Sequence, residues 1–335
     1  MPSQIKAKDF TNPTFQSTSA LLTQNPEYYT IWNFRRLILQ NYISAELSKD
    51  PSSLPPSDLQ AAEAANHTPA QHEILLLLRE DLAFLIPLLK QYPKCYWIWN
   101  HRAWLLATAT EHLPCRPAIE LWEGELGMVT KMLGLDPRNF HGWGYRRDVV
   151  AHLERLGGES MVETEFEYAT KMIQGNLSNF SAWHYRSQLI PPLLSARRAS
   201  AGERTQFLAA EFDLITKALY TDPYDQSLWF YHQYLMATLD PANAQAVPIL
   251  DPCGRAERLR YLEQEIESLR EMLDGAEDCK YIYQALLDYA RRYRDLGAGT
   301  AAVTMQEMRG WLSELRKIDP LREGRWRDLE AKMES

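Results

Sequence analysis

Apolar side chains recur at helical spacing along most of the chain, and short polar or turn-forming stretches separate these segments. In 255–273, for example, leucine or isoleucine returns every three or four residues, as on one face of an α-helix. No segment shows the apolar–polar alternation of a half-buried β-strand. The pattern therefore predicts an all-α protein. After a short first helix that ends near Gln24, the expected helices are 26–47, 73–91, 96–112, 119–135, 139–156, 161–174, 179–190, 203–220, 226–239, 255–273, 279–296, 301–318 and 321–333.

A second pattern lies on these helices and recurs five times. It consists of a proline, an aromatic residue three positions later, tryptophan at six, a second aromatic at eight and arginine at nine. One copy has leucine for the proline, and two copies have histidine in the aromatic or the arginine position. The repeat helices are centred on Trp32, Trp99, Trp143, Trp183 and Trp229, at gaps of 67, 44, 40 and 46 residues. A period near 40–47 residues is typical of a solenoid of helical hairpins.

The repeat predicts a single α-α solenoid over residues 1–335. Segments 255–296 and 301–335 keep the helical spacing without the full pattern, so we interpret them as degenerate copies. Such copies are expected at the end of a solenoid, where one side meets water. Residues 49–71, rich in proline and alanine, lengthen the first gap and are expected to form a mobile loop.

Within one copy of the repeat, each residue of the pattern suggests a structural role. We expect the proline in the first turn of a helix, with Asn25, Asp136 and Asp222 as N-caps in three copies. The aromatic residues are expected in the core. Arginine is rarely buried without a partner, so each repeat arginine should pair with an acid of the next hairpin; lining an inner groove is the alternative.

Proline and small residues elsewhere suggest further boundaries. Pro87 should weaken or kink the helix at 73–91, because proline removes a backbone donor and clashes one turn back. The pair 191–192 is expected to end the helix that begins at 179, and 113–118 is expected to be a turn.

Composition narrows the class of function. The chain has 36 Lys and Arg against 44 Asp and Glu, so its net charge of −8 gives no attraction to nucleic acid or acidic membrane. The four cysteines form no Cys-x-x-Cys motif, and no metal or redox site is expected. The apolar run 74–89 contains three charged residues, and the first nine residues are polar. We therefore expect no membrane span, no signal peptide and a reduced, cytoplasmic compartment.

The residue types and their spacing indicate few groups that could bind a ligand or catalyse a reaction. No glycine-rich phosphate loop is present. Lys94, expected in the first turn of its helix, can add its charge to a phosphate site at a helix N-terminus. A solvated surface lysine is the alternative, and sequence alone favours it. Considered without relatives, the chain is a helical-repeat scaffold with a broad surface.

The repeat resembles that of the protein prenyltransferase α subunits, in the segments 32–36, 143–147 and 183–186. The match covers the chain from about Gln24 to its end. Within that family the chain looks most like the short form of the Rab (type II) geranylgeranyltransferase α subunits, without immunoglobulin-like or leucine-rich domains. The segments that point there are 138–141, 178–187, 221–232 and 318–322.

The resemblance implies a crescent-shaped, right-handed superhelical solenoid wrapped around a separate β subunit. It implies that this β subunit, and not the present chain, holds the catalytic zinc and the lipid pocket; a need for magnesium is left open. In the family a lysine in a Pro-Lys-x-Tyr segment contacts the lipid diphosphate, and Pro93 to Tyr96 matches that segment. By this resemblance Lys94 is the candidate diphosphate contact and Tyr96 a weaker neighbour.

The resemblance also implies partners and substrates. The enzyme would transfer geranylgeranyl from geranylgeranyl diphosphate, held at the subunit interface, to C-terminal cysteines of Rab GTPases. A Rab escort protein would present them and dock near 161–239. Trp97 occupies the position where the farnesyltransferase α subunit has a glutamine that binds the carboxylate of a CaaX tail, which favours the Rab enzyme. The α subunit of farnesyltransferase or type I geranylgeranyltransferase is the alternative enzyme, and a non-catalytic helical-repeat scaffold is the alternative class.

Overall fold

The computed structural model describes residues 1–49, 67–243, 246–297 and 302–334. Within these ranges every regular element is a helix, which confirms the prediction of an all-α chain built of helical hairpins. The chain divides into two compact units, Met1–Met161 and Val162–Ser335. Among the described helices, none is both long enough and apolar enough to cross a membrane.

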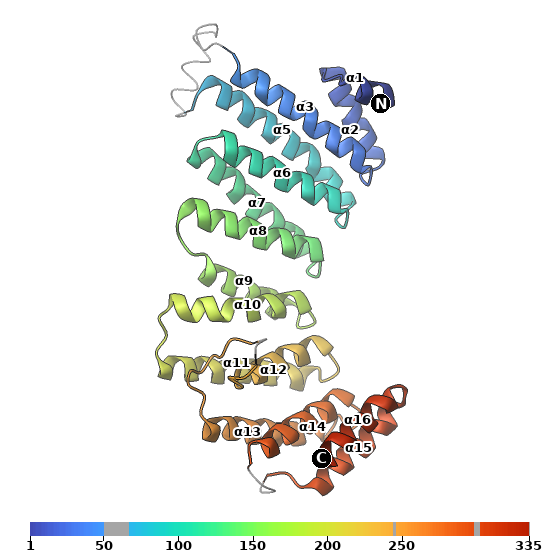
Figure 1. Cartoon of the computed structure of the whole chain (residues 1–335), viewed down its shortest axis with the longest axis vertical. Coiled ribbons are helices and arrows are strands. Elements are labelled where there is room, and N and C mark those ends of the chain that lie inside the picture. Colours follow the sequence, from blue (N-terminus) through green and yellow to red (C-terminus); the bar gives the residue numbers. More distant parts are fainter. Residues whose placement is uncertain (50–66, 244–245, 298–301, 335) are drawn as a thin grey trace. The chain divides into compact units, whose positions relative to one another are not determined.

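Unit 1 contains three successive hairpins, α2–α3, α5–α6 and α7–α8, preceded by one short helix. Figure 1 shows these hairpins stacked in the order of the chain. Their stacking buries the apolar face of each helix against the next hairpin, as expected of a solenoid. The described helices of unit 1 are α1 (Pro2–Ala7), α2 (Asn12–Gln24), α3 (Tyr29–Leu47), α5 (Pro69–Gln91), α6 (Tyr96–His112), α7 (Cys115–Leu135) and α8 (Phe140–Gly157).

Unit 2 continues with the hairpins α9–α10, α11–α12 and α13–α14, and ends with α15 and α16. The segment 255–296 thus forms a helical hairpin although its tryptophan is missing. The elements of unit 2 are α9 (Val162–Gly175), α10 (Phe180–Ala196), α11 (Ala201–Thr221), α12 (Gln226–Thr238), α13 (Arg255–Leu273), α14 (Lys280–Asp295), α15 (Met305–Ile318), the 3₁₀ turn η2 (Pro320–Arg322) and α16 (Glu323–Glu334).

Two helices begin earlier than the sequence pattern predicts. The expected loop 49–71 gives way to α5 at Pro69, because Thr68 and Gln71 form a capping box in which each side chain binds the other's backbone N–H. Most of that loop, residues 50–66, lies outside the described residues. The expected turn 113–118 is also too long, since α7 begins at Cys115 and accommodates a proline in its first turn.

Two described helices continue through internal prolines, which contradicts the predicted helix end at residues 191–192. Helix α5 continues through Pro87. This proline lies on the exposed face of the helix, where water can reach the carbonyl one turn back that has lost its N–H donor. Pro191 and Pro192 do not end α10, which runs to Ala196. Pro191 deprives the Ser187 carbonyl of its helical donor, and the Tyr234 hydroxyl from α12 donates to that carbonyl instead, at 2.9 Å.

The repeat prolines lie in the turns and not inside the following helices, contrary to the prediction. The helices begin three residues later, and Asn25, Asp136 and Asp222 are C-cap residues of the preceding helices. Each repeat tryptophan turns its indole N–H back onto the carbonyl six positions before it. The N–O distances are 2.7 Å for Trp32, 2.9 Å for Trp99, 2.8 Å for Trp143, 2.8 Å for Trp183 and 2.7 Å for Trp229. Because the acceptor is backbone, leucine replaces proline in the fourth copy without loss of the bond.

In three turns the same carbonyl accepts a second bond, from the N-cap residue of the next hairpin. The donors are Cys95 to Pro26 at 3.4 Å, Asn139 to Pro93 at 3.0 Å and Cys279 to Pro223 at 3.1 Å. Burial raises the pKa of the Cys95 thiol to about 11, so it stays protonated and can donate. These three hydrogen bonds connect each of these turns to the corresponding turn of the next hairpin.

We expect Trp99→Phe to lower the free energy of unfolding by about 1–2 kcal/mol, because it removes the indole bond to the Pro93 carbonyl. The carbonyl keeps its bond from Asn139. Trp104→Phe is the comparison variant, since its half-buried indole makes no hydrogen bond to a described residue. Equal losses in urea unfolding of the two variants would contradict a role for the bond.

Buried carboxylates join successive hairpins, which confirms the predicted arginine–acid pair in three copies, at Arg35, Arg102 and Arg186. Glu125 of α7 accepts from Arg102 of α6, in the hairpin before it, and from the Tyr145 hydroxyl of α8, in its own hairpin, at 2.7 Å. Glu211 is shared in the same way by Arg186 and Tyr231. Burial and the neighbouring carboxylate raise the pKa of both tyrosines well above the usual value. We call each such group a carboxylate joint.

The joint between the first two described hairpins has a different composition. Asp81 binds Arg35 and accepts from His101 Nε2 at 2.7 Å. Arg36 donates to His101 Nδ1 at 3.3 Å, so His101 is held in its neutral form between a carboxylate and a cation. Burial lowers the pKa of His101, with Arg36 and Arg35 acting in the same direction and Asp81 opposing it.

Acidification should therefore destabilise unit 1 in the range where histidine titrates. A lowered folded-state pKa means that the unfolded chain binds more protons below about pH 6.5, the ordinary value, so stability falls as pH falls. The slope from this one group approaches about 1.4 kcal/mol per pH unit. We expect His101→Tyr, which copies the tyrosine of the other joints, to reduce that slope between pH 6.5 and 5 in urea titrations. An unchanged slope would exclude His101 as its source.

Candidate functional site

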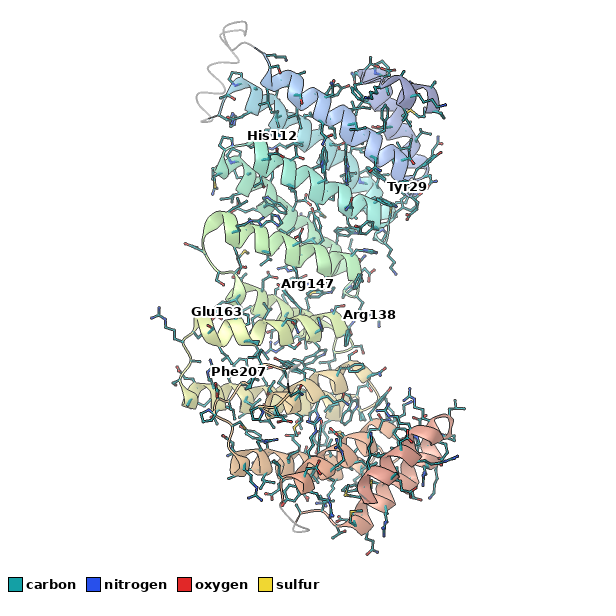
Figure 2. The ribbon with its side chains drawn as sticks, in the orientation of Figure 1. Tyr29, His112, Arg138, Arg147, Glu163 and Phe207 are labelled. Carbon is teal, nitrogen blue, oxygen red and sulfur yellow. The ribbon has the colours of Figure 1, made fainter. Side chains whose placement is uncertain are left out.

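The candidate residues lie at one end of the hairpins of unit 1, where the turns are found. We call this surface the turn edge and define it as turns 25–28, 92–95 and 136–139 with the first turns of α3, α6 and α8. Figure 2 shows Tyr29 and Arg138 at this end of their hairpins, whereas His112 lies at the opposite end. The bonds from Cys95 and Asn139 to the preceding turns hold the three turns side by side.

Lys94 lies in the turn between α5 and α6 and not in the first helical turn, as the sequence pattern suggested. Its side chain is exposed, and no hydrogen bond or ion pair joins it to a described residue. The backbone on both sides is fixed, because the Pro93 carbonyl is bound by Trp99 and Asn139. Lys94 is thus an unpaired cation on a rigid support.

Tyr96, the weaker candidate, opens α6 two residues later and is 52% exposed. Its hydroxyl accepts from Asn100 at 3.4 Å, and the Asn100 side chain is itself bound by Arg36 at 2.6 Å. The Tyr96 ring lies 6.3 Å from His141 at the start of α8. The structure thus brings Tyr96 to the same surface as Lys94.

The first aromatic of each repeat was expected in the core, and that expectation was wrong. Tyr29, Tyr96, Phe140 and Phe180 are between 46% and 78% exposed. They occupy the first position of their helices, where the side chain points away from the stacked hairpins. The tryptophans and the second aromatics remain buried. A row of exposed rings on unit 1 is unusual for a free surface and indicates a partner.

Trp97 lies beside these exposed rings. Its ring lies 5.7 Å from Tyr29 of the previous hairpin and 5.4 Å from Tyr96. The side chain is half-buried by these contacts. An indole at this point offers an apolar face and no amide to bind a carboxylate.

The acids of the carboxylate joints are important residues that the sequence reasoning missed. The spacing was available: each acid lies 20 positions before the tyrosine or histidine that binds it. Glu165, one of these acids, is fully buried and accepts from the Tyr185 hydroxyl. The pairs are Asp81–His101, Glu125–Tyr145, Glu165–Tyr185 and Glu211–Tyr231.

The described residues contain no group of three or more His, Cys, Asp or Glu side chains placed to hold a metal ion. The turn edge instead gathers cations, a phenol, an imidazole and exposed rings. Such a surface can bind an anion beside an apolar group. The Cys95 thiol in this surface is buried and stays protonated, so it is a poor nucleophile. The surface therefore suits a contribution to a site completed by another chain.

Comparisons with known proteins agree with this architecture. The model of the protein prenyltransferase alpha subunit repeat matches residues 14–42, 78–109, 122–153, 162–191 and 208–239, and each segment contains one repeat tryptophan. The geranylgeranyl transferase type-2 subunit alpha of Saccharomyces cerevisiae is 32% identical over 327 residues, which cover 96% of this chain and 86% of that protein. The Schizosaccharomyces pombe protein of the same name is 33% identical over 335 residues, covering 98% and 87%.

Longer relatives and a solved structure extend the comparison. The Homo sapiens geranylgeranyl transferase type-2 subunit alpha is 33% identical over 239 residues, 71% of this chain and 36% of that protein. The solved structure of Candida albicans protein geranylgeranyltransferase-I complexed with GGPP matches with a TM-score of 0.62 and 18% identity. The match covers 98% of this chain and 87% of the solved one. At that identity the likeness concerns the fold.

Proposed function

This chain belongs to the family of geranylgeranyl transferase type-2 α subunits, among the protein prenyltransferase α subunits, and on that premise we propose that it is the α subunit of a Rab geranylgeranyltransferase. The observation that carries the proposal is the identity with type-2 subunits over nearly the whole chain, with five repeats in register. The enzyme transfers a geranylgeranyl group to C-terminal cysteines of Rab GTPases. It works in the cytoplasm as a heterodimer and has no activity without its β subunit.

The turn edge is the proposed contact with the β subunit. Exposed rings at the starts of α3, α6 and α8 supply apolar area, and interfaces favour aromatic residues of this kind. The unpaired Lys94 lies among them, so the same contact would bring it to the partner's prenyl diphosphate pocket. This supports the role of Lys94 that the family motif suggests.

The reaction divides between the subunits. A sulfur–carbon bond forms between the acceptor cysteine and the first carbon of the lipid, while the bond from that carbon to the diphosphate oxygen breaks. A zinc ion held by the β subunit would supply the acidity that converts the thiol into a thiolate. Lys94 stabilises the negative charge that grows on the leaving diphosphate. Tyr96, next to it, is proposed to orient the same group.

The escort protein is proposed to dock within 161–239 of unit 2. A cavity of about 220 Å³ lies there between α10 and α12, lined mainly by aromatic residues. Two of them, Phe180 and Phe230, remain 46% and 48% exposed. An opening of this size accepts one large side chain, which suits a small anchored contact.

The test is co-expression with the cognate β subunit, followed by transfer from geranylgeranyl diphosphate to a Rab in complex with its escort protein. Rab transfer without transfer to CaaX peptides supports the proposal. Transfer to CaaX peptides alone would assign the chain to the farnesyltransferase and type I α subunits. Failure of any β subunit to copurify would favour a non-catalytic scaffold.

A further inference from the structure

The turn that precedes each second helix of a hairpin presents one residue just before the N-cap. These equivalent positions are Glu27, Lys94, Arg138, Ser178, Tyr224 and Asp278. Among these six described turns, only the second and third carry a cation, and they are adjacent in unit 1. The first turn carries an acid. An anion at this surface is therefore favoured between the second and third turns.

A hydrogen bond joins these two turns directly. Asn139, the neighbour of Arg138, donates from Nδ2 to the carbonyl of Pro93, the neighbour of Lys94, at 3.0 Å. By ordinary backbone and side-chain dimensions the two Cα atoms then lie within roughly 13 Å of each other. Side chains of this length can converge on one diphosphate from that separation.

Both cations are available. Lys94 and Arg138 are exposed, and neither is joined by a hydrogen bond or ion pair to any residue in the described part of the chain. At the starts of α6 and α8, two and three residues after these cations, the rings of Tyr96 and His141 lie 6.3 Å apart. The two helix N-termini, each of a helix of 17 or 18 residues, therefore open side by side and add the positive ends of their dipoles.

We propose that Arg138 contacts the diphosphate of the prenyl donor together with Lys94, so that each of the two phosphate groups has its own cation from this chain. The proposal rests on the prenyl-transfer function proposed above. The planar fork of the guanidinium suits two oxygens of one phosphate, whereas lysine acts as a point charge. When the carbon–oxygen bond breaks, both electrons of that bond remain on the diphosphate, and the pair of cations stabilises them.

The experiment uses the heterodimer with its cognate β subunit and three probes: geranylgeranyl diphosphate, inorganic diphosphate and uncharged geranylgeraniol. For Arg138→Gln we expect the Kd of geranylgeranyl diphosphate and the inhibition constant of inorganic diphosphate to rise about tenfold. The affinity for geranylgeraniol should not change. Arg138→Lys should recover part of the loss. Lys131→Gln, which removes an exposed cation of α7 five residues before turn 136–139 and outside the turn edge, should have no effect.

Unchanged inhibition by inorganic diphosphate in Arg138→Gln would overturn the inference while leaving Rab transfer intact. An equal loss for geranylgeraniol would also overturn it, because that pattern reports a distorted pocket and not a missing charge. If the unmodified heterodimer transfers no prenyl group and binds no prenyl diphosphate, the proposed function itself fails. The three results are distinguishable in one set of titrations.

Discussion

Replacing Glu125 by alanine should lower the free energy of unfolding by about 3–5 kcal/mol. The carboxylate binds Arg102 through two nitrogens and also accepts from Tyr145, all in the interior between two hairpins. Its removal leaves the guanidinium buried, with the Leu82 carbonyl as its remaining hydrogen-bond partner. The loss should appear in urea unfolding and, locally, as faster hydrogen exchange in α6, α7 and α8.

A combined variant separates the pair's own contribution from the penalty of a stranded charge. Arg102→Leu with Glu125→Leu and Tyr145→Phe removes the whole carboxylate joint and leaves no unpaired group. We expect this triple variant to lose less stability than Glu125→Ala alone. A triple variant that loses the sum of its single changes would contradict the account, because it would mean that the ion pair itself carries the stability.

Lys94→Ala should slow single-turnover prenyl transfer by the heterodimer roughly 100-fold, the usual effect of removing one group that stabilises developing charge. The side chain is exposed and makes no hydrogen bond or ion pair with a described residue, so neither the fold nor assembly with the β subunit should suffer. Single-turnover transfer to the Rab–escort complex under saturating lipid measures the chemical step. Copurification of the β subunit measures assembly.

The matched control for that variant is Lys90→Ala. Lys90 lies four residues earlier, exposed in the last turn of α5, and carries the same charge. It should transfer at the rate of the unmodified enzyme. Lys94→Arg should retain a measurable part of the activity, since the charge remains. Unchanged transfer by Lys94→Ala would remove Lys94 from the site and leave the heterodimer proposal standing.

Helix positions could be predicted from the sequence because periodicity reports burial directly. Tyr96–His112 and Arg255–Leu273 agree with the expected bounds at both ends. The predicted helix boundaries were wrong where the structure of one segment depends on its contacts with another. The spacing of proline and tryptophan was read as a helix start, whereas it records an indole that binds a backbone carbonyl. The continuation of α10 through Pro191 depends on Tyr234 of the next hairpin.

The candidate site was predicted less fully for the same reason. Lys94 and Tyr96 were found through a family motif, and the structure brings both to one surface. Arg138 was not singled out, because its proximity to Lys94 depends on the bond from Asn139 to Pro93 between two hairpins. The exposure of Phe140 was also missed. The helical pattern does not show that a side chain in the first position of a helix points away from the neighbouring hairpins.

The carboxylate joints also bear on how such a chain can change its length during evolution. The joint on Asp81 uses a short acid with a histidine, whereas the joint on Glu125 uses a longer acid with a tyrosine. A hairpin that is copied or moved as a unit carries an acid that binds the preceding hairpin and an arginine that binds the following one. In a new position, both side chains must match their new partners in length and in hydrogen-bonding groups. The hairpins joined in this way are therefore not interchangeable modules, and the chemistry of each described joint constrains which hairpin can follow which.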